Sequence, residues 1–121
     1  MPAAEQAVIA TLQQLPFESL LEVTVAAEDG VEQSLLLYRD AAGVRAWRNL
    51  CPHAGRRLDW APGEFLFNHS GQVMCAVHGA SFELGQGLCV SGPCRGQHLQ
   101  AVAVQVQAGQ VRLAAGALLS D

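Results

Sequence analysis

Two stretches decide the fold of this 121-residue chain: N-L-C-P-H-A-G-R-R-L at residues 49–58 and C-A-V-H-G-A-S-F at residues 75–82. Each stretch holds a cysteine and a histidine within four residues of one another. Thiolate and imidazole are the ligands that soft and borderline transition metals prefer. The sequence therefore predicts one metal centre held from two loops by Cys51, His53, Cys75 and His78.

Two kinds of centre fit these four ligands. One is a closed tetrahedral zinc site with two sulfurs and two nitrogens. The other is a [2Fe–2S] cluster in which two cysteines hold one iron and two histidines hold the other. Zinc sites usually leave two to four residues between the ligands of a pair, whereas Cys51 and His53 are separated by one. The spacing favours the cluster and leaves zinc as the alternative.

The residues around both pairs resemble the Rieske ferredoxin family over about residues 43–113. The family pattern is C-x-H-x-G-x-x-L, then C-x-x-H-G-x-x-F, then a Gly-Pro loop, here G-Q-G-L-C-V-S-G-P-C at residues 85–94. The resemblance implies one Rieske [2Fe–2S] cluster bound by the same four residues at the tips of two loops. It also implies that the Gly92-Pro93 loop packs over the cluster.

The pattern of apolar residues predicts a mainly β chain. Short strands are expected at residues 20–25, 32–39, 44–49, 64–67, 72–77, 80–84, 101–107 and 111–114. Residues 3–15 have apolar side chains at helical spacing and end at Pro16, which predicts one N-terminal helix. With the resemblance, we expect a Rieske-like antiparallel β-sandwich with a two-loop cluster-binding subdomain and a short N-terminal helix.

The length predicts a single domain over residues 1–121. Within it we expect a helical extension at residues 1–16 and a cluster-binding part at about residues 49–96. The interval between His53 and Cys75 is 21 residues, longer than is usual in the family, so we expect an additional turn there.

Glycines close to the ligands have an expected role of their own. Gly55 and Gly79 follow the ligand histidines by two residues and one residue. We expect them to allow close backbone approach to the cluster and to offer amide donors to its sulfurs.

Comparison with the two branches of the family predicts a low reduction potential. High-potential members carry an extra cysteine in each loop and hydroxyl groups near the cluster sulfurs. Here the loops lack the extra cysteines, and the hydroxyl positions after His78 hold Ala80 and Phe82. Fewer hydrogen bonds to sulfur stabilise the reduced state less, so we expect a potential of roughly −150 mV.

Several residues near the loops have two possible interpretations. Cys89 and Cys94 are expected as buried thiols beneath the Gly-Pro loop, with a short-loop disulfide as the alternative. Arg56, Arg57 and Arg95 either offset the charge of the reduced cluster and meet an acidic partner, or are solvated loop residues. His69 and His98 fit no metal pattern and are expected at the surface.

The composition narrows the class of function. Residues 1–40 carry seven acidic residues against Arg39 alone, and the whole chain has a formal charge of −4, which argues against nucleic-acid binding. We find no targeting pattern and no apolar run of membrane-spanning length, so a cytoplasmic protein is expected. An oxygenase would need a second iron site of two histidines and a carboxylate, for which only His69 and His98 remain.

These observations predict an electron-transfer protein with no self-contained catalytic site. It would take single electrons from a reductase and pass them to an oxygenase or a similar acceptor. The alternative is a small structural or binding subunit of a larger redox enzyme, with zinc in the same site.

Overall fold

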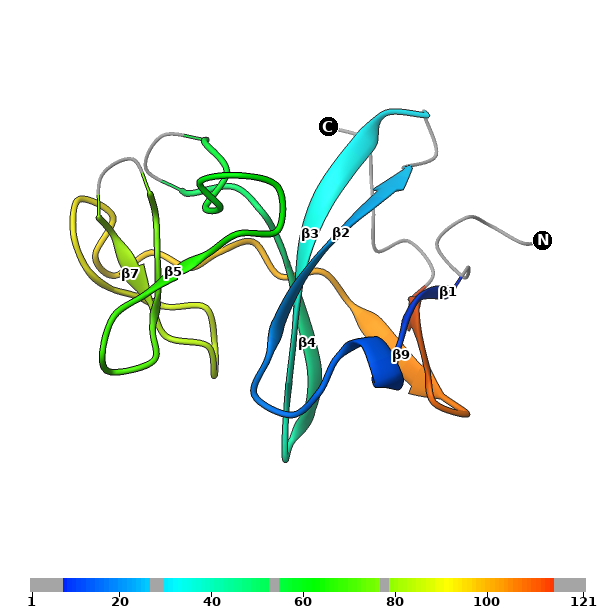
Figure 1. Ribbon diagram of the computed structural model, residues 1–121. Coiled ribbons are helices and arrows are strands. Elements are labelled where there is room, and N and C mark those ends of the chain that lie inside the picture. The colour runs from blue at the N-terminus through cyan, green and yellow to red at the C-terminus, as the bar shows by residue number, and fades with distance from the viewer. Residues whose placement is uncertain (1–7, 27–29, 53–54, 77–78, 115–121) are drawn as a thin grey trace. The chain divides into compact units, whose positions relative to one another are not determined.

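The computed structural model describes residues 8–26, 30–52, 55–76 and 79–114 (Figure 1). The chain divides into two compact units. The first comprises residues 1–48 and 101–121, and the second comprises residues 49–100.

The first unit contains two three-stranded antiparallel sheets. One has the order β2-β3-β4 and the other the order β1-β10-β9. The strands are β1 (Val8–Thr11), β2 (Leu20–Ala26), β3 (Glu32–Asp40), β4 (Gly43–Arg48), β9 (Val104–Gln107) and β10 (Gln110–Leu113). The turn between β3 and β4 is closed by the Ala42 N–H, which donates to the Asp40 carboxylate (2.9 Å). These strands confirm the ones predicted at residues 20–25, 32–39, 44–49, 101–107 and 111–114.

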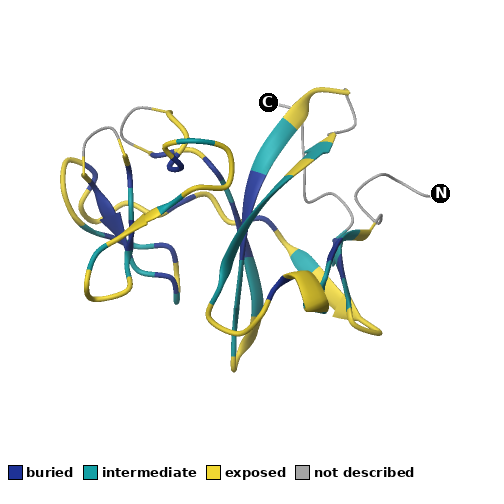
Figure 2. Cartoon of the chain, viewed as in Figure 1, coloured by how far each residue is buried: buried dark blue, intermediate teal, exposed yellow. Residues whose placement is uncertain are grey.

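The core of the first unit draws on both sheets. Side chains alternate between the two faces of a strand, so Leu35 and Leu37 of β3 lie on one face and Leu36 on the other. Leu35 and Leu37 join Val111 of β10 in one buried cluster. Leu36 is equally buried and is paired in register with Trp47 of β4. The middle of β3 is therefore covered on both faces (Figure 2).

The predicted N-terminal helix is wrong in the part that the structure describes. Val8–Thr11 form β1, which pairs with β10, and only Leu12–Gln14 turn as a 3-10 helix, η2. Residues 1–7 lie outside the described residues. The β-branched side chains of Val8 and Ile9 suit an extended strand, and β10 offers a neighbour for it. The same apolar spacing that predicted a helix instead buries Ala10 and Leu15 in the core.

The second unit contains one four-stranded antiparallel sheet of order β5-β6-β7-β8. Its strands are β5 (Leu66–Phe67), β6 (Val73–Met74), β7 (Ser81–Phe82) and β8 (Cys89–Ser91). Strand β8 was not predicted, and the others are shorter than the sequence suggested. Apart from η2, the described residues contain no helix. The chain is mainly β, with three small antiparallel sheets.

The long interval between the Cys/His pairs contains the additional turn that was expected. A tight turn forms where the Glu64 N–H donates to the Ala61 carbonyl (2.8 Å). A second turn joins β5 to β6, and there the Asn68 carboxamide oxygen accepts from the N–H groups of Ser70 and Gln72 (both 3.0 Å). The extra residues are thus folded into local turns between the ligand loops.

Candidate metal centre

The two predicted ligand loops close with the same backbone hydrogen bonds. In the first loop the Cys51 N–H donates to the Arg56 carbonyl and the Gly55 N–H donates to the Cys51 carbonyl (both 2.7 Å). In the second, the Cys75 N–H donates to the Ala80 carbonyl (2.7 Å) and the Gly79 N–H donates to the Cys75 carbonyl (2.9 Å). The backbone of each cysteine is therefore hydrogen-bonded to the residues four and five positions further on. The turns match although His53 follows its cysteine by two positions and His78 by three.

Gly55 and Gly79 set the left-handed turns of the two ligand loops. Their φ angles are +66° and +73°, in the left-handed region that side chains with a Cβ seldom adopt. A Cβ at either position would meet none of the described residues within 4 Å. Their N–H groups bond to the cysteine carbonyls, so the expectation that these amides donate to cluster sulfurs is wrong.

Both cysteines at the centre are buried. Cys51 is 0% exposed and Cys75 is 1% exposed, so their sulfurs lie where water does not compete for a metal. His53 and His78 lie outside the described residues, within the same two loops. Two buried thiolate donors and two imidazoles in matched turns fit the ligand chemistry of a cluster with one sulfur-ligated and one nitrogen-ligated iron.

A polar network fixes the base of the first loop. The Asn49 carboxamide oxygen accepts from the Leu58 N–H (2.8 Å), and its NH2 group donates to Asp59 (3.1 Å). Arg57 donates to both oxygens of Asp59 (2.9 and 2.7 Å), and the Gly63 N–H donates to the same carboxylate (3.1 Å). The network joins the two ends of the loop, on either side of Cys51.

The network also sets the charge state of Asp59. Burial alone would raise the pKa of this carboxyl. The hydrogen bonds from Arg57, Gly63 and Asn49 outweigh burial and hold the pKa below its usual value. The Arg57 guanidinium is thereby paired within the loop, although Arg57, like Arg56 and Arg95, is exposed to solvent. No motif predicts this network; its only local sign is Asn49, two residues before the first ligand.

Apolar packing supports the second loop. Gly92, with φ +101°, lies so close to Ala80 that a Cβ on Gly92 would be 2.7 Å from the Ala80 Cα. The Gly-Pro loop therefore packs on the second ligand loop. Ala80 and Phe82 are both fully buried. These two positions hold hydroxyl donors in high-potential members of the family. Here they are apolar and inaccessible to water.

Cys89 and Cys94 are buried thiols, as expected. Each is 1% exposed, and the four cysteines form no disulfide. The Cys94 thiol donates to the Cys89 sulfur (3.0 Å), and the Cys89 thiol donates to the Ser91 carbonyl (3.2 Å). Burial, together with hydrogen bonds to the sulfurs of Cys89 and Cys51, raises the pKa of Cys94 to about 12.

The remaining histidines and cysteines do not form a second metal site among the described residues. His69 and His98 are exposed, as predicted. Within the part of the chain that the structure describes, no three side chains of His, Cys, Asp or Glu form a group that could hold a metal. Cys89 and Cys94 therefore do not make a further ligand set with Cys51. Among the same residues, no helix is long and apolar enough to cross a membrane.

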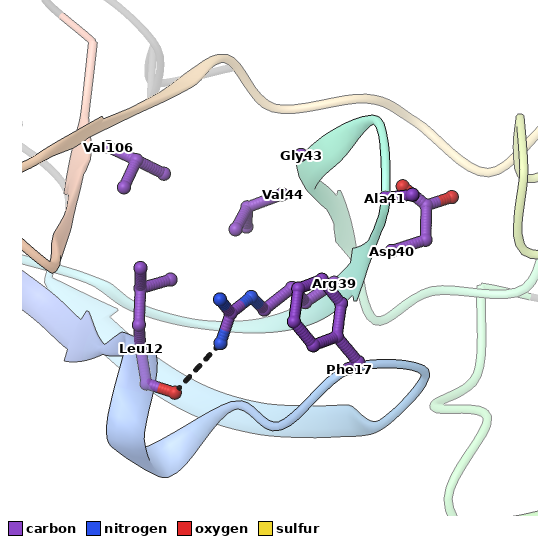
Figure 3. A pocket seen from close by; sticks show the side chains of 8 residues that line it. All are labelled: Leu12, Phe17, Arg39, Asp40, Ala41, Gly43, Val44 and Val106. Atoms are coloured by element: carbon purple, nitrogen blue, oxygen red, sulfur yellow. Dashed lines mark hydrogen bonds between the residues drawn. The ribbon is translucent and has the colours of Figure 1, made fainter.

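The first unit carries a cavity of about 240 Å³ (Figure 3). The Arg39 guanidinium lies beside it, donating to the carbonyls of Leu12 (3.4 Å) and Leu15 (3.3 Å). The Phe17 ring lies 4.1 Å from the same guanidinium. Arg39 thus holds the η2 turn against β3, and the remaining lining is mostly apolar. Asp40, also in the lining, is paired with Arg45 (2.7 Å).

The fold and the paired loops define a small β-protein of the iron–sulfur class. The family model of the Rieske [2Fe-2S] domain matches residues 6–111, and the chain belongs to that family. The cofactor of the family is a [2Fe–2S] cluster of the Rieske type.

Three known proteins show how the chain compares within this family. The oxidoreductase NdmD of Pseudomonas putida is 34% identical over 86 residues, which are 70% of this chain. The chain spans only 13% of the length of that protein. The ferredoxin of carbazole 1,9a-dioxygenase from Nocardioides aromaticivorans IC177 is 25% identical, with a TM-score of 0.64, 90% of this chain covered and 96% of that one. A chain in a complex of reduced oxygenase and oxidised ferredoxin in carbazole 1,9a-dioxygenase is 20% identical, with a TM-score of 0.66 and coverages of 98% and 100%.

Proposed function

We propose that this chain is a Rieske ferredoxin, which carries single electrons through one [2Fe–2S] cluster. Cys51 and Cys75 would hold one iron, and His53 and His78 the other. The observation that carries the proposal is the pair of matched turns around two buried cysteines, in a chain whose match covers 96% of a known ferredoxin.

The residues of the chain have distinct parts in this function. When bound, the cluster supplies one-electron chemistry, cycling between a diferric and a mixed-valence state. The turns closed by Gly55 and Gly79 hold the two cysteines, and burial of their sulfurs keeps water away from them. Buried Ala80 and Phe82 offer no hydroxyl donors, which supports the low potential, roughly −150 mV, expected for this chain.

The proposed partners are an electron-donating reductase and a terminal oxygenase that accepts the electron. This proposal is supported by a solved complex of oxygenase and ferredoxin in carbazole 1,9a-dioxygenase. One chain of that complex is similar in structure to this chain. Exposed Arg56 and Arg95 would offset the added negative charge and meet an acidic partner surface. We place the protein in the cytoplasm, because the hydrogen-bonded thiols of Cys89 and Cys94 suit a reducing compartment.

For the architecture, we propose a single domain over residues 1–121. Its cluster-binding part would be residues 49–96, nearly the whole of the second compact unit. The two sheets of the first unit would pack as a β-sandwich, which is supported by a buried cluster drawn from both β3 and β10.

The second candidate is a redox module within a larger enzyme. It is favoured by the similarity to the much longer oxidoreductase NdmD, of which this chain spans a small part. In that case electrons would pass to the cluster from another part of the same assembly. Zinc in the same four positions remains the alternative for the metal.

Electron transfer to an isolated oxygenase tests the proposal. The chain is purified without air, reduced with dithionite, freed of excess reductant and mixed with the terminal oxygenase of carbazole 1,9a-dioxygenase. We expect the visible bands of the chain to return to the oxidised form as one electron per chain is transferred. Cys75→Ser should lose the cluster and therefore transfer no electrons. The matched variant Cys89→Ser should keep both the cluster and electron transfer.

Two results would overturn the proposal. A colourless protein with one zinc per chain would exclude an electron carrier. A cluster that is reduced by dithionite but passes no electrons to oxygenases of this type would favour the module in a larger enzyme.

A further inference from the structure

The cavity of the first unit is lined by an arginine that uses only part of its hydrogen-bonding capacity. The Nη1 group of Arg39 donates to the carbonyls of Leu12 (3.4 Å) and Leu15 (3.3 Å). Among the described residues, no acceptor bonds to its Nε or Nη2 group, and no carboxylate pairs with it. The remaining N–H donors of this guanidinium therefore lie together along the edge formed by Nε and Nη2.

The contacts of Arg39 fix the direction of this edge. The bonds to Leu12 and Leu15 hold one end of the guanidinium against the backbone of η2, and the Phe17 ring centroid lies 4.1 Å from its central carbon. In Figure 3 one guanidinium nitrogen bonds to the Leu12 carbonyl, and the other two lie on the side that faces Val44 and Val106. The free edge therefore faces the lining of the cavity.

The turn that carries Phe17 is strained. Glu18 has a φ of +61°, in the left-handed region that a residue with a Cβ seldom adopts. The Glu18 N–H donates to the Arg39 carbonyl (2.6 Å), and the Ser19 N–H donates to the Pro16 carbonyl (3.2 Å). Because Phe17 is 62% exposed, burial of its ring does little to offset this strain. Strain of this kind is typical of ligand-binding sites, and here it keeps an aromatic ring beside the cavity.

Arg39 is the unneutralised charge among the lining residues. Asp40 also lines the cavity, but its carboxylate is paired with Arg45 (2.7 Å) and accepts from the Ala42 N–H (2.9 Å). The other lining residues are apolar or glycine. The cavity therefore combines one positive edge with an apolar surface.

We propose that this cavity binds a small organic carboxylate with an apolar body. The N–H groups of Nε and Nη2 on Arg39 match the two oxygens of a carboxylate, and a charge-assisted pair of this kind is stronger than a neutral one. Leu12, Val44 and Val106 would contact the apolar body. The proposal goes beyond electron transfer and does not depend on the cluster, because every lining residue belongs to the first compact unit.

Size and access limit the ligand further. The volume of about 240 Å³ is below the range of about 300–1,000 Å³ that is common for drug-sized ligands, so the ligand is small. Phe17 and Val106 are 62% and 42% exposed, so a ligand can reach the lining from solvent.

Benzoate is the probe for this site. Its binding to the oxidised holoprotein is followed by 15N–1H NMR, in which the Arg39 Nε–H resonance should shift until the site is saturated. Acetate has the carboxylate without the apolar body, and benzamide has the body without the charge. Each of these two should bind at least about tenfold more weakly than benzoate.

Variants separate the charge of Arg39 from its structural role. Arg39→Gln should weaken benzoate binding by at least about tenfold, and Arg39→Lys, which keeps the charge without the two-donor edge, should lie between. Because Arg39 also supports η2, Val106→Asp is a second variant. It keeps the bonds of Arg39, places a negative charge in the lining and should weaken binding by at least about tenfold.

Arg112→Gln is the matched control. It removes a positive charge from β10 of the same unit, outside the lining of the cavity, so its affinity for benzoate should stay within about twofold of that of the natural protein.

Four results would overturn the proposal. In the first, the Arg39 Nε–H resonance does not move when benzoate is added. In the second, benzamide binds as tightly as benzoate. In the third, Arg112→Gln weakens binding as much as Arg39→Gln or Val106→Asp. In the fourth, acetate and benzoate bind equally, which would indicate non-specific attraction of anions without contact to the apolar lining.

Discussion

The two ligand loops form the same turn but are supported by different forces. In both, the cysteine carbonyl accepts from a glycine four residues on. The first loop is held at its base by hydrogen bonds among Asn49, Arg57 and Asp59. The second is held by close packing of Gly92 on Ala80. The same backbone turn is therefore stabilised by polar and charged hydrogen bonds in the first loop and by close packing in the second.

The difference predicts that the loops fail under different perturbations. A change of volume should damage the second loop, and a change of charge should damage the first. Because a two-iron centre needs ligands from both loops, either failure should release the cluster.

The largest effect is expected from Gly92→Ala. The new Cβ would lie 2.7 Å from the Ala80 Cα, at a φ of +101° that alanine adopts only with strain. We expect a loss of about 2–4 kcal/mol in the free energy of unfolding, together with loss of iron. Urea unfolding and iron content measure both.

Gly96→Ala is the matched control for this clash. Gly96 lies in the same loop with a φ of +92°, but a Cβ there would meet no described residue within 4 Å. It should cost only about 1 kcal/mol and keep the cluster. Equal losses in the two variants would show that backbone strain, and not contact with the second ligand loop, makes Gly92 necessary.

Asp59→Ala should have the next largest effect. It removes the acceptor for Arg57 and for the buried Asn49 side chain. We expect a loss of about 2–3 kcal/mol, because a buried donor is left without a partner. Thermal unfolding and the rate of iron release to a chelator report the effect. Asp40→Ala breaks a more exposed pair with Arg45, and should leave iron release unchanged; a similar release rate would contradict the role of the Asp59 network.

A smaller and equal effect is expected from Gly55→Ala and Gly79→Ala. Both glycines have positive φ, and no residue that the structure describes lies within 4 Å of the Cβ position. Each substitution should cost about 1 kcal/mol, since only the left-handed conformation is penalised. Differential scanning calorimetry of the two variants, side by side, checks the equality. A loss at one position more than twice that at the other would show that the two turns are not equivalent.

The smallest effect is a dependence on pH that belongs to the first loop. The pKa of Asp59 is lowered in the folded protein, so the unfolded chain takes up its proton at a higher pH. The stabilisation by Asp59 is complete above the ordinary pKa of about 3.9 and is lost as the pH falls through the lowered value. The unfolding free energy of Asp59→Asn should therefore decline less than that of the natural protein between pH 6 and pH 3. Parallel declines would show that Asp59 is not the titrating group.

Local patterns predicted much of the fold, and contacts distant in sequence account for the failures. The alternation in β2, β3 and β4 marked those strands, and the paired Cys/His motifs marked the ligand loops. The spacing of Val8, Ile9 and Leu15 was compatible with both helix and strand, and pairing with β10 decided for the strand. Propensity is a weak guide when a neighbouring strand offers hydrogen bonds.

The contacts that stabilise the two ligand loops could not be predicted either, because they join residues that are distant in the sequence. The bond between Asn49 and Asp59 spans ten residues, and the packing of Gly92 on Ala80 joins positions twelve residues apart. The periodicity of apolar residues does not predict such contacts, because they depend on how the turns are closed. Gly55 and Gly79 were singled out, but neither their left-handed φ angles nor the acceptors of their N–H groups were predicted.

The most direct test of the account is Mössbauer spectroscopy of the 57Fe-loaded, dithionite-reduced protein. The account predicts two iron sites of equal area: a ferric site with sulfur ligands from Cys51 and Cys75, and a ferrous site with nitrogen ligands from His53 and His78. A spectrum with two equivalent sulfur-ligated irons, or a protein that takes up no iron, would contradict it.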